Sequence, residues 1–211
     1  MFRIIIRMIA CAGIFAVALT AGASAAWCQA GKEISGLPNF GRVTDTLYRG
    51  AQPASAGFSA LQAMGVGIVV NFRDERGEMA NEKREVEALG IKYMGIPWNG
   101  RDEPSTAQVV EFLDLVRANP TVKVFVHCQR GADRTGVMIA AYRIAVEHRT
   151  VAQALSEMHQ FHYDWFFLPQ LERYVKSLPG LLRNDTRFSA YAPAVATAGA
   201  ATAVAPSVSA R

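Results

Sequence analysis

The stretch HCQRGADRTG, residues 127–136, decides the fold. A run of apolar residues, 122–126, leads into it, and apolar residues at helical spacing, 137–146, follow it. The pattern predicts a strand, a tight loop that contains Gly131, and a helix. Because a helix begins where the loop ends, its unpaired backbone N–H groups favour an anion there.

Two side chains in this loop are suited to attack on a phosphoryl group. Cys128 lies at the start of the loop and Arg134 near its end, with five residues between them. A helix N-terminus and nearby cations favour a thiolate over a thiol, so we expect Cys128 to be a nucleophilic thiolate at neutral pH. The planar guanidinium of Arg134 is expected to hold two phosphoryl oxygens at once, which a lysine could not do in that geometry.

The spacing H-C-x5-R-T resembles the signature loop of the protein tyrosine phosphatase superfamily, and the whole string is most similar to its bacterial, dual-specificity-like (atypical) members. His127, Gly131, Thr135 and Gly136 make the match more specific than C-x5-R alone. A second stretch, LYRGAQP at residues 47–53, resembles the opening of atypical dual-specificity phosphatases. The resemblance implies cysteine-dependent hydrolysis of phosphomonoesters through a phosphocysteine intermediate.

The other residues of the loop have implied roles as well. Thr135 is expected to donate a hydrogen bond to the sulfur of Cys128 and so ease its departure in the second step, and His127 is expected to order the loop. Phosphate binding is expected from the backbone N–H groups of Gln129, Arg130, Gly131, Ala132, Asp133 and Arg134.

The general acid must come from another loop. By resemblance this loop follows a strand that ends at Ile96, and it contains Asp102 and Glu103. Asp102 is the candidate acid, and the sequence alone does not exclude Glu103. The alternative is that both residues are solvated loop charges.

Further charged residues bear on the substrate. Arg130 is expected to point outward, toward a second phosphate or an acidic substrate. Gly131-Ala132-Asp133 departs from the Gly-Lys-His that many atypical members have at this place. An aspartate in the loop, as at Asp133, resembles some lipid- and inositol-directed phosphatases. The absence of a lysine at position 132 argues against a polyphosphate substrate. Three more arginines could line the mouth of the site, although plain surface charges are the favoured interpretation: Arg49, Arg73 and Arg76.

Composition excludes several classes of partner. The 211 residues carry a formal net charge of +4, and without Arg3 and Arg7 the count is 20 basic against 18 acidic residues. A surplus of this size does not indicate nucleic-acid binding. The histidines show no metal-site spacing with carboxylates or cysteines, so we expect neither a metal nor a cofactor.

The N-terminus has the pattern of a secretory signal. Arg3 and Arg7 precede a 14-residue apolar stretch, 8–21, which is short for a membrane span. Ala23-Ser24-Ala25 predicts cleavage after Ala25, with Ala30 as a second possibility and an uncleaved anchor as the alternative. We therefore expect export to the periplasm or the medium, with no stable membrane insertion after cleavage.

Of the three cysteines, Cys11 leaves with the signal and Cys28 leaves only with the later cut. Cys128 is then the sole thiol, and no internal disulfide is possible. A buried, inert cysteine is the alternative interpretation of Cys128, but a polar loop is not expected to bury it.

Strands alternate with helices, which predicts an α/β fold with a central, mainly parallel sheet flanked by helices on both faces. Residues 26–188 are predicted to form one phosphatase domain, expected to be monomeric, and the Ala-, Thr-, Pro- and Ser-rich residues 189–211 a flexible tail. Strands are predicted at 42–44, 47–49, 66–72, 91–96 and 122–126, and helices at 53–64, 78–89, 105–118, 137–146, 150–158 and about 165–178.

Other enzyme classes fit the loop less well. Rhodanese-like proteins have a shorter loop between Cys and Arg, and arsenate reductases carry further redox cysteines that this chain lacks. A phosphatase acting on a phosphorylated protein, or on a small phosphoester, is therefore the leading hypothesis. The alternatives are an inositol-phosphate or phosphoinositide phosphatase and a non-catalytic, phosphate-binding pseudophosphatase.

Overall fold

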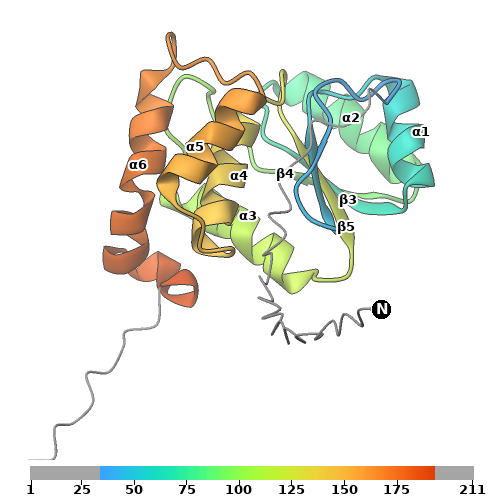
Figure 1. The fold of residues 1–211 in the computed structure, drawn as a ribbon. Coiled ribbons are helices and arrows are strands. Elements are labelled where there is room, and N and C mark those ends of the chain that lie inside the picture. Colours follow the sequence, from blue (N-terminus) through green and yellow to red (C-terminus); the bar gives the residue numbers. More distant parts are fainter. Residues whose placement is uncertain (1–33, 193–211) are drawn as a thin grey trace, which may run out of the picture.

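A computed structural model of the chain describes residues 34–192. They form three layers, with one sheet between two layers of helices (Figure 1). The five strands lie in the order β1-β2-β5-β3-β4, and all neighbours are parallel except β1 and β2. This confirms the predicted mainly parallel α/β sheet. The strands are β1 (Gly41–Arg42), β2 (Leu47–Gly50), β3 (Val66–Asn71), β4 (Lys92–Gly95) and β5 (Lys123–His127).

Helices cover both faces of the sheet, as Figure 1 shows. On one face lie α1 (Ser55–Ala63) and α2 (Arg76–Ala88), and on the other α3 (Thr106–Ala118), α4 (Asp133–Ala145), α5 (Val151–Gln160) and α6 (Pro169–Asn184). Successive strand residues point to opposite faces, so Val124 and Val126 join the core under α3 to α6, whereas Phe125 joins the core under α1 and α2.

Helix α4 lies at the centre of the larger layer. Every residue of α4 except Tyr142 is buried, because α3, α5 and α6 all pack around it. A helix that is surrounded in this way is held firmly in place. The signature loop joins β5 to the N-terminus of α4, so the loop is fixed at both of its ends.

Several helix boundaries differ from the predicted ones, three helices by the most. α1 begins at Ser55, after Pro53, and α4 begins at Asp133, so that Arg134 and Thr135 belong to the helix and not to the loop. The last helix begins at Pro169, a favoured first helical residue, and runs past Pro179 to Asn184. The aromatic residues 165–167, which the prediction places at the start of this helix, form an exposed turn instead.

The predicted end of the domain at residue 188 is also wrong. Residues Thr186–Tyr191 form a 3-10 helix, η1, which buries Phe188 and Tyr191. The hydroxyl of Tyr191 donates to Oδ1 of Asp114 on α3 at 2.7 Å. Two large aromatic side chains therefore attach this segment, which includes the first residues of the predicted tail, to the domain.

The predicted signal peptide 1–25, Cys11, Cys28 and residues 193–211 lie outside the described residues. Within residues 34–192, no helix is long and apolar enough to cross a membrane.

Candidate active site

Cys128 lies at the base of the signature loop, directly after β5. Residues Asp133, Arg134 and Thr135 form the first turn of α4, where backbone N–H groups lack helical acceptors and favour an anion. Only 2% of Cys128 is exposed, so the expectation that a polar loop would not bury it is wrong. Cys128 belongs to the core cluster that includes residues of β5 and α4, and these neighbours enclose the thiol. A substrate must therefore bring its phosphoryl group into the loop.

The second sequence motif, LYRGAQP, packs behind this loop. Gly131 has a φ of +68°, and a Cβ there would lie 2.4 Å from the carbonyl of Gly50, so only glycine fits. Nη2 of Arg49 donates to the Gly131 carbonyl at 2.8 Å, and the Gln52 N–H donates to the Gln129 carbonyl at 3.2 Å. The two stretches that resemble phosphatases are therefore one packed unit.

Arg49 supports the loop and does not line its mouth. Its side chain is fully buried, and its guanidinium lies 3.8 Å from the centre of the Phe161 ring. Arg73 is also buried, so the interpretation of these two residues as surface charges is wrong, whereas Arg76 is exposed at the start of α2.

Arg134 is held by one end of its guanidinium group. Nη1 donates to Oδ1 of Asp74 at 2.8 Å, to the Trp98 carbonyl at 3.2 Å and to the Phe72 carbonyl at 3.4 Å. Nε and Nη2 make no hydrogen bond to any described residue. Those two nitrogens form the edge of the guanidinium that can bind two oxygens of a phosphoryl group.

The sequence did not single out Asp74. It follows β3, and β3 pairs in parallel with β5, so the carboxyl ends of both strands meet at the same edge of the sheet. An acidic residue just after a buried strand next to the signature strand was the available indication.

His127 is bound to a buried carboxylate on α2. Its Nε2 lies 2.8 Å from Oε1 of Glu82, and its Nδ1 lies 3.3 Å from the Cys128 carbonyl. Both ring nitrogens therefore face acceptors, which fixes the orientation of the ring beside the nucleophile. The predicted role of ordering the loop is consistent with this geometry, but the partner, Glu82, could not be found from sequence.

Two amides complete the environment of Glu82. Asn71 Nδ2 and Gln52 Nε2 each donate to its Oε2 at 2.8 Å. Their orientations are defined by Arg73, whose backbone N–H donates to Asn71 Oδ1 and whose Nη1 donates to Gln52 Oε1, both at 2.7 Å. Both amide N–H₂ groups therefore point at the carboxylate, and Glu82 is placed to act as a hydrogen-bond acceptor.

The hydroxyl of Thr135 is buried and has no hydrogen-bond partner among the described residues. Its bond to the Cys128 sulfur therefore stays a prediction. A buried hydroxyl without a partner is costly, and its place in the first turn of α4 beside the loop agrees with a role in binding.

The outward-facing charge of the loop is partly neutralised. Nη2 of Arg130 donates to Oδ2 of Asp133 at 2.7 Å and lies 3.7 Å from Asp164. The hydrogen bond to Asp133 raises the pKa of Arg130 above its ordinary value. The Asp164 N–H in turn donates to Oδ1 of Asp133 at 3.0 Å, so this carboxylate ties the loop to the turn before α6.

The structure brings the loop of Asp102 against Arg134. Trp98 contributes a carbonyl to Nη1, and a Cβ on Gly100 would lie 3.0 Å from Nε. Asp102 is exposed, and its Oδ2 accepts a 3.0 Å hydrogen bond from Asn99 of the same turn. Glu103 lies toward α6, where burial first and this carboxylate second raise the pKa of Tyr174.

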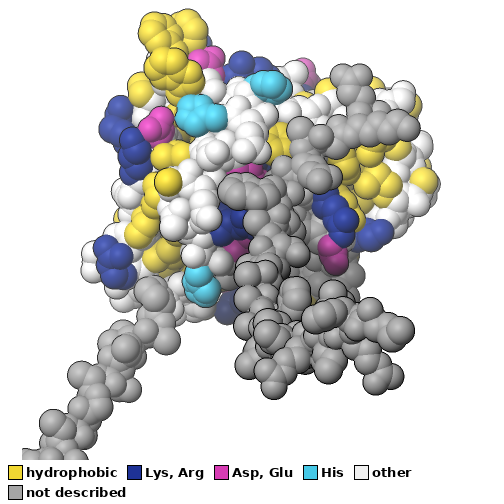
Figure 2. Space-filling view, viewed as in Figure 1, with side chains coloured by type: hydrophobic (Ala, Val, Ile, Leu, Met, Phe, Trp, Pro, Cys, Tyr) yellow, Lys and Arg dark blue, Asp and Glu magenta, His cyan; other side chains and the backbone are white. Residues whose placement is uncertain are grey.

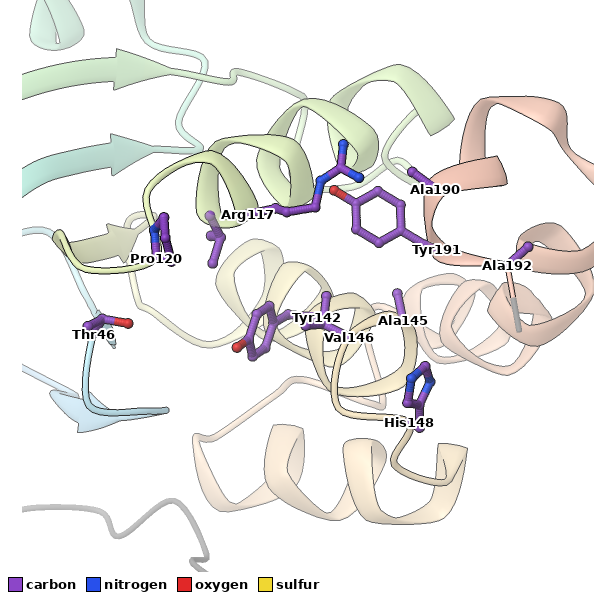
Figure 3. A pocket seen from close by; sticks show the side chains of 11 residues that line it. Thr46, Arg117, Pro120, Tyr142, Ala145, Val146, His148, Ala190, Tyr191 and Ala192 are labelled. Atoms are coloured by element: carbon purple, nitrogen blue, oxygen red, sulfur yellow. The ribbon is translucent and has the colours of Figure 1, made fainter. Parts of the chain in front are cut away.

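The pocket in Figure 3 is not part of this site. It has a volume of about 560 Å³ and is lined by Tyr142, Val146, His148 and Tyr191, at the C-terminal end of α4. The signature loop lies at the other end of α4, about 18 Å away along a helix of this length.

A parallel α/β sheet with a C-x5-R loop at the N-terminus of a buried helix defines the class of cysteine-based phosphatases. The chain belongs to the family described as "DSP-PTPase phosphatase fused to NAD+ Kinase", whose model matches residues 34–172.

Curated relatives are similar to the chain over a comparable length. Dual specificity protein phosphatase TpbA of Pseudomonas aeruginosa is 31% identical over 136 residues, 64% of this chain. The match spans 58% of the relative's length. The crystal structure of TpbA superimposes with a TM-score of 0.64 and 26% identity, over 81% of this chain and 99% of that chain. A TpbA cysteine-to-serine variant solved in complex with phosphotyrosine has a TM-score of 0.63 and 28% identity, over 75% and 95%.

A more distant structural neighbour is similar in fold only. The catalytic core of the PP-IP phosphatase SIW14 from S. cerevisiae has a TM-score of 0.58 and 18% identity, over 72% of this chain and 95% of that chain.

Proposed function

We propose that this protein hydrolyses phosphomonoesters through a phosphocysteine intermediate and acts as a dual-specificity-like protein tyrosine phosphatase. The observation that carries the proposal is the geometry of Arg134. Its Nη1 is occupied by three acceptors, and its other edge is left for a phosphoryl group in the loop that starts at Cys128.

The reaction would proceed in two steps. The Cys128 sulfur attacks phosphorus as the bond to the leaving oxygen breaks, and Asp102 gives its proton to that oxygen. Water then attacks the phosphocysteine while Asp102 takes up a proton, and the Cys128 thiolate leaves. Arg134 and the N–H groups of the loop stabilise the equatorial oxygens in both steps.

The proposed substrate is a phosphorylated protein, with phosphotyrosine as the favoured group. TpbA, the relative described above, was solved in complex with phosphotyrosine. An inositol-phosphate or phosphoinositide substrate is the alternative. The pairing of Arg130 with Asp133 and Asp164 argues against it, because that guanidinium is already balanced by two carboxylates.

The first test is hydrolysis of p-nitrophenyl phosphate in the presence of EDTA. We expect activity that survives chelation and is lost in Cys128→Ser, because serine is a far weaker nucleophile in this loop. Activity near that of the wild type in Cys128→Ser would contradict the assignment of the nucleophile. Inactive, folded wild-type protein would favour a pseudophosphatase.

A substrate panel then separates the two candidate activities. Phosphotyrosine, phosphoserine and phosphothreonine peptides are compared with soluble inositol phosphates and phosphoinositides at equal concentrations. A larger kcat/KM for phosphotyrosine peptides is expected, and a preference for the inositol compounds would replace the proposed substrate by the alternative.

We also propose that the protein is exported to the periplasm or the medium as a monomer. The apolar stretch 8–21 and the small residues up to Ala25 support export. Cell fractionation with N-terminal sequencing tests it: a mature chain that begins at Ala26 or Gly31 is expected, and an uncleaved chain in the cytoplasm would contradict export.

A further inference from the structure

Three consecutive aromatic side chains project from the turn between α5 and α6. Trp165, Phe166 and Phe167 are 59%, 69% and 75% exposed, and among the described residues only Val146 is another exposed large hydrophobic residue. In Figure 2 a knob of hydrophobic side chains stands out from the surface at the end of the molecule where Figure 1 places this turn. We call these three residues the aromatic turn.

The aromatic turn is held in a defined conformation. The Phe167 N–H donates to Oδ1 of Asp164 at 3.2 Å, and the Leu168 N–H donates to the Asp164 carbonyl at 3.0 Å. The buried Tyr163 donates from its hydroxyl to the Leu168 carbonyl and accepts the Glu172 N–H at 3.1 Å. Exposure of the three rings is therefore a property of a braced turn and not of a fraying end.

The same turn is connected to the signature loop. Asp164, which precedes Trp165, donates its N–H to Asp133 and lies 3.7 Å from the guanidinium of Arg130. Whatever binds the aromatic turn is thereby brought next to the loop that contains Cys128.

The shape and chemistry of the turn favour one kind of partner. The rings contact one another edge to face, with centres 6.0 and 5.1 Å apart, and form a convex tip. A protein partner would need a matching pocket, whereas a bilayer accepts a convex apolar tip directly, and Trp and Phe are favoured at its interface.

Two of the neighbouring basic side chains are already paired. Arg130 faces Asp133 and Asp164, and on α6 Lys176 lies 2.7 Å from Glu172. Attraction to anionic headgroups is therefore not the expected driving force, and insertion of the apolar tip is. The apolar segment 8–21, if it serves in export, brings the chain to a membrane.

We propose that the aromatic turn inserts into the surface of a lipid bilayer and holds the signature loop at that surface. The association is peripheral, since only three side chains enter the lipid. Given the proposed function, on which this step rests, the site would then act on phosphorylated proteins presented at a membrane.

The test is quenching of tryptophan fluorescence by vesicles of brominated phosphatidylcholine, with the full chain. The chain has three tryptophans: Trp27, Trp98 and Trp165. Subtracting the signal of Trp165→Phe, which keeps the turn apolar, isolates Trp165, whether or not the N-terminal segment is still present. We expect this Trp165-dependent emission to fall by about half or more on contact with vesicles, since interfacial rings sit at the headgroup–acyl boundary.

A second measurement uses vesicle sedimentation. The variant with Ser at positions 165, 166 and 167 is expected to partition about tenfold less or worse than wild type, because the apolar surface is lost. Val146→Ser, which removes the other exposed hydrophobic side chain, is the matched control and should bind as wild type does. Binding should be similar with zwitterionic and partly anionic vesicles.

Two results would overturn the proposal. One is Trp165 emission that the brominated vesicles do not quench, whether or not the chain sediments with them. The other is unchanged partitioning of the triple-serine variant together with a raised KM for soluble phosphopeptides, which would make the turn a protein-docking surface. Turnover of p-nitrophenyl phosphate by the triple-serine variant is expected to equal that of wild type, so loss of the proposed catalytic function would be seen separately.

Discussion

Asp102 and Glu103 are adjacent in sequence, but they face different parts of the molecule. Asp102 belongs to the turn that packs on Arg134, whereas Glu103 lies toward Tyr174. A general acid matters most when the leaving group is a poor one. We therefore expect Asp102→Asn to slow hydrolysis of an alkyl phosphate by about 100-fold or more, and p-nitrophenyl phosphate far less.

The measurement is kcat for both substrates in Asp102→Asn and in Glu103→Gln. Glu103→Gln should behave like wild type. The reverse pattern would move the acid by one residue, and equal loss for both substrates would indicate a role in binding.

Glu82 is expected to matter for both stability and turnover. In Glu82→Gln, an amide N–H₂ group would replace an acceptor that receives the donors of Asn71, Gln52 and His127. One buried donor would then face other donors, which costs about 1–3 kcal/mol of unfolding free energy.

Denaturant unfolding and kcat for p-nitrophenyl phosphate check this expectation. Because His127 would lose its fixed orientation beside Cys128, kcat should fall along with stability. Glu87→Gln, on the exposed side of α2, is the control and should change neither. Full activity in Glu82→Gln would show that the network is dispensable.

For single residues, the sequence was informative where the catalytic residues lie close together in the chain. Cys128 and Arg134 lie within one decapeptide, and local spacing is enough to assign them. Arg49, Asp74 and Glu82 act on the loop from three other segments, and their roles depend on which strands become neighbours. Hydrophobic periodicity does not specify such long-range contacts.

Among the elements, the turn before α6 shows how a sequence pattern can mislead. The sequence predicts a helix from about residue 165, through the aromatic run 165–167, but the helix begins at Pro169 and these three side chains are exposed. By contrast, the Ser105 and Thr150 capping boxes are formed, and α3 begins where Ser105 predicts. Helix caps depend on local sequence and can therefore be predicted from it. Whether an aromatic side chain is buried or exposed is decided by tertiary packing.

The buried phenol of Tyr163 makes this element sensitive to high pH. Burial, above all, raises the pKa of Tyr163 to about 12, compared with about 10 in the unfolded chain. The native state therefore keeps its proton after the unfolded state has lost it. The stability that Tyr163 contributes is complete below about pH 10 and is lost as pH rises through about 12, by an amount on the order of 2 kcal/mol.

Unfolding free energies of wild type and Tyr163→Phe, measured between pH 9 and pH 12, test this effect. Burial also raises the pKa of Tyr93, Tyr174 and Tyr191, so the difference between the two proteins is the relevant quantity. That difference should shrink as pH rises, and a constant difference would contradict a role for the phenol proton.

On the scale of the whole molecule, the domain extends past its predicted end at residue 188, through the 3-10 helix η1. Phe188 and Tyr191 of η1 are buried, and the Tyr191 ring lies 5.1 Å from the guanidinium of Arg117 on α3. The mainly parallel sheet and the helices on both faces could be predicted from alternation, but this boundary could not, because two aromatic residues decide it.

We therefore expect a chain that ends after residue 185 to be several kcal/mol less stable than one that ends after residue 192, since each large buried aromatic side chain contributes about 1.5–3 kcal/mol. Thermal unfolding of the two truncated chains measures the difference. Equal melting temperatures would mean that η1 packs without contributing to stability.

The three acceptors on Nη1 of Arg134 affect the thermodynamics of ligand binding. A free arginine side chain has about 2 kcal/mol of rotamer entropy to lose when it is ordered. Here the carboxylate of Asp74 and two carbonyl groups restrict that freedom during folding, before any phosphate arrives. An incoming anion thus meets a guanidinium that is already oriented, and more of its interaction enthalpy appears as affinity.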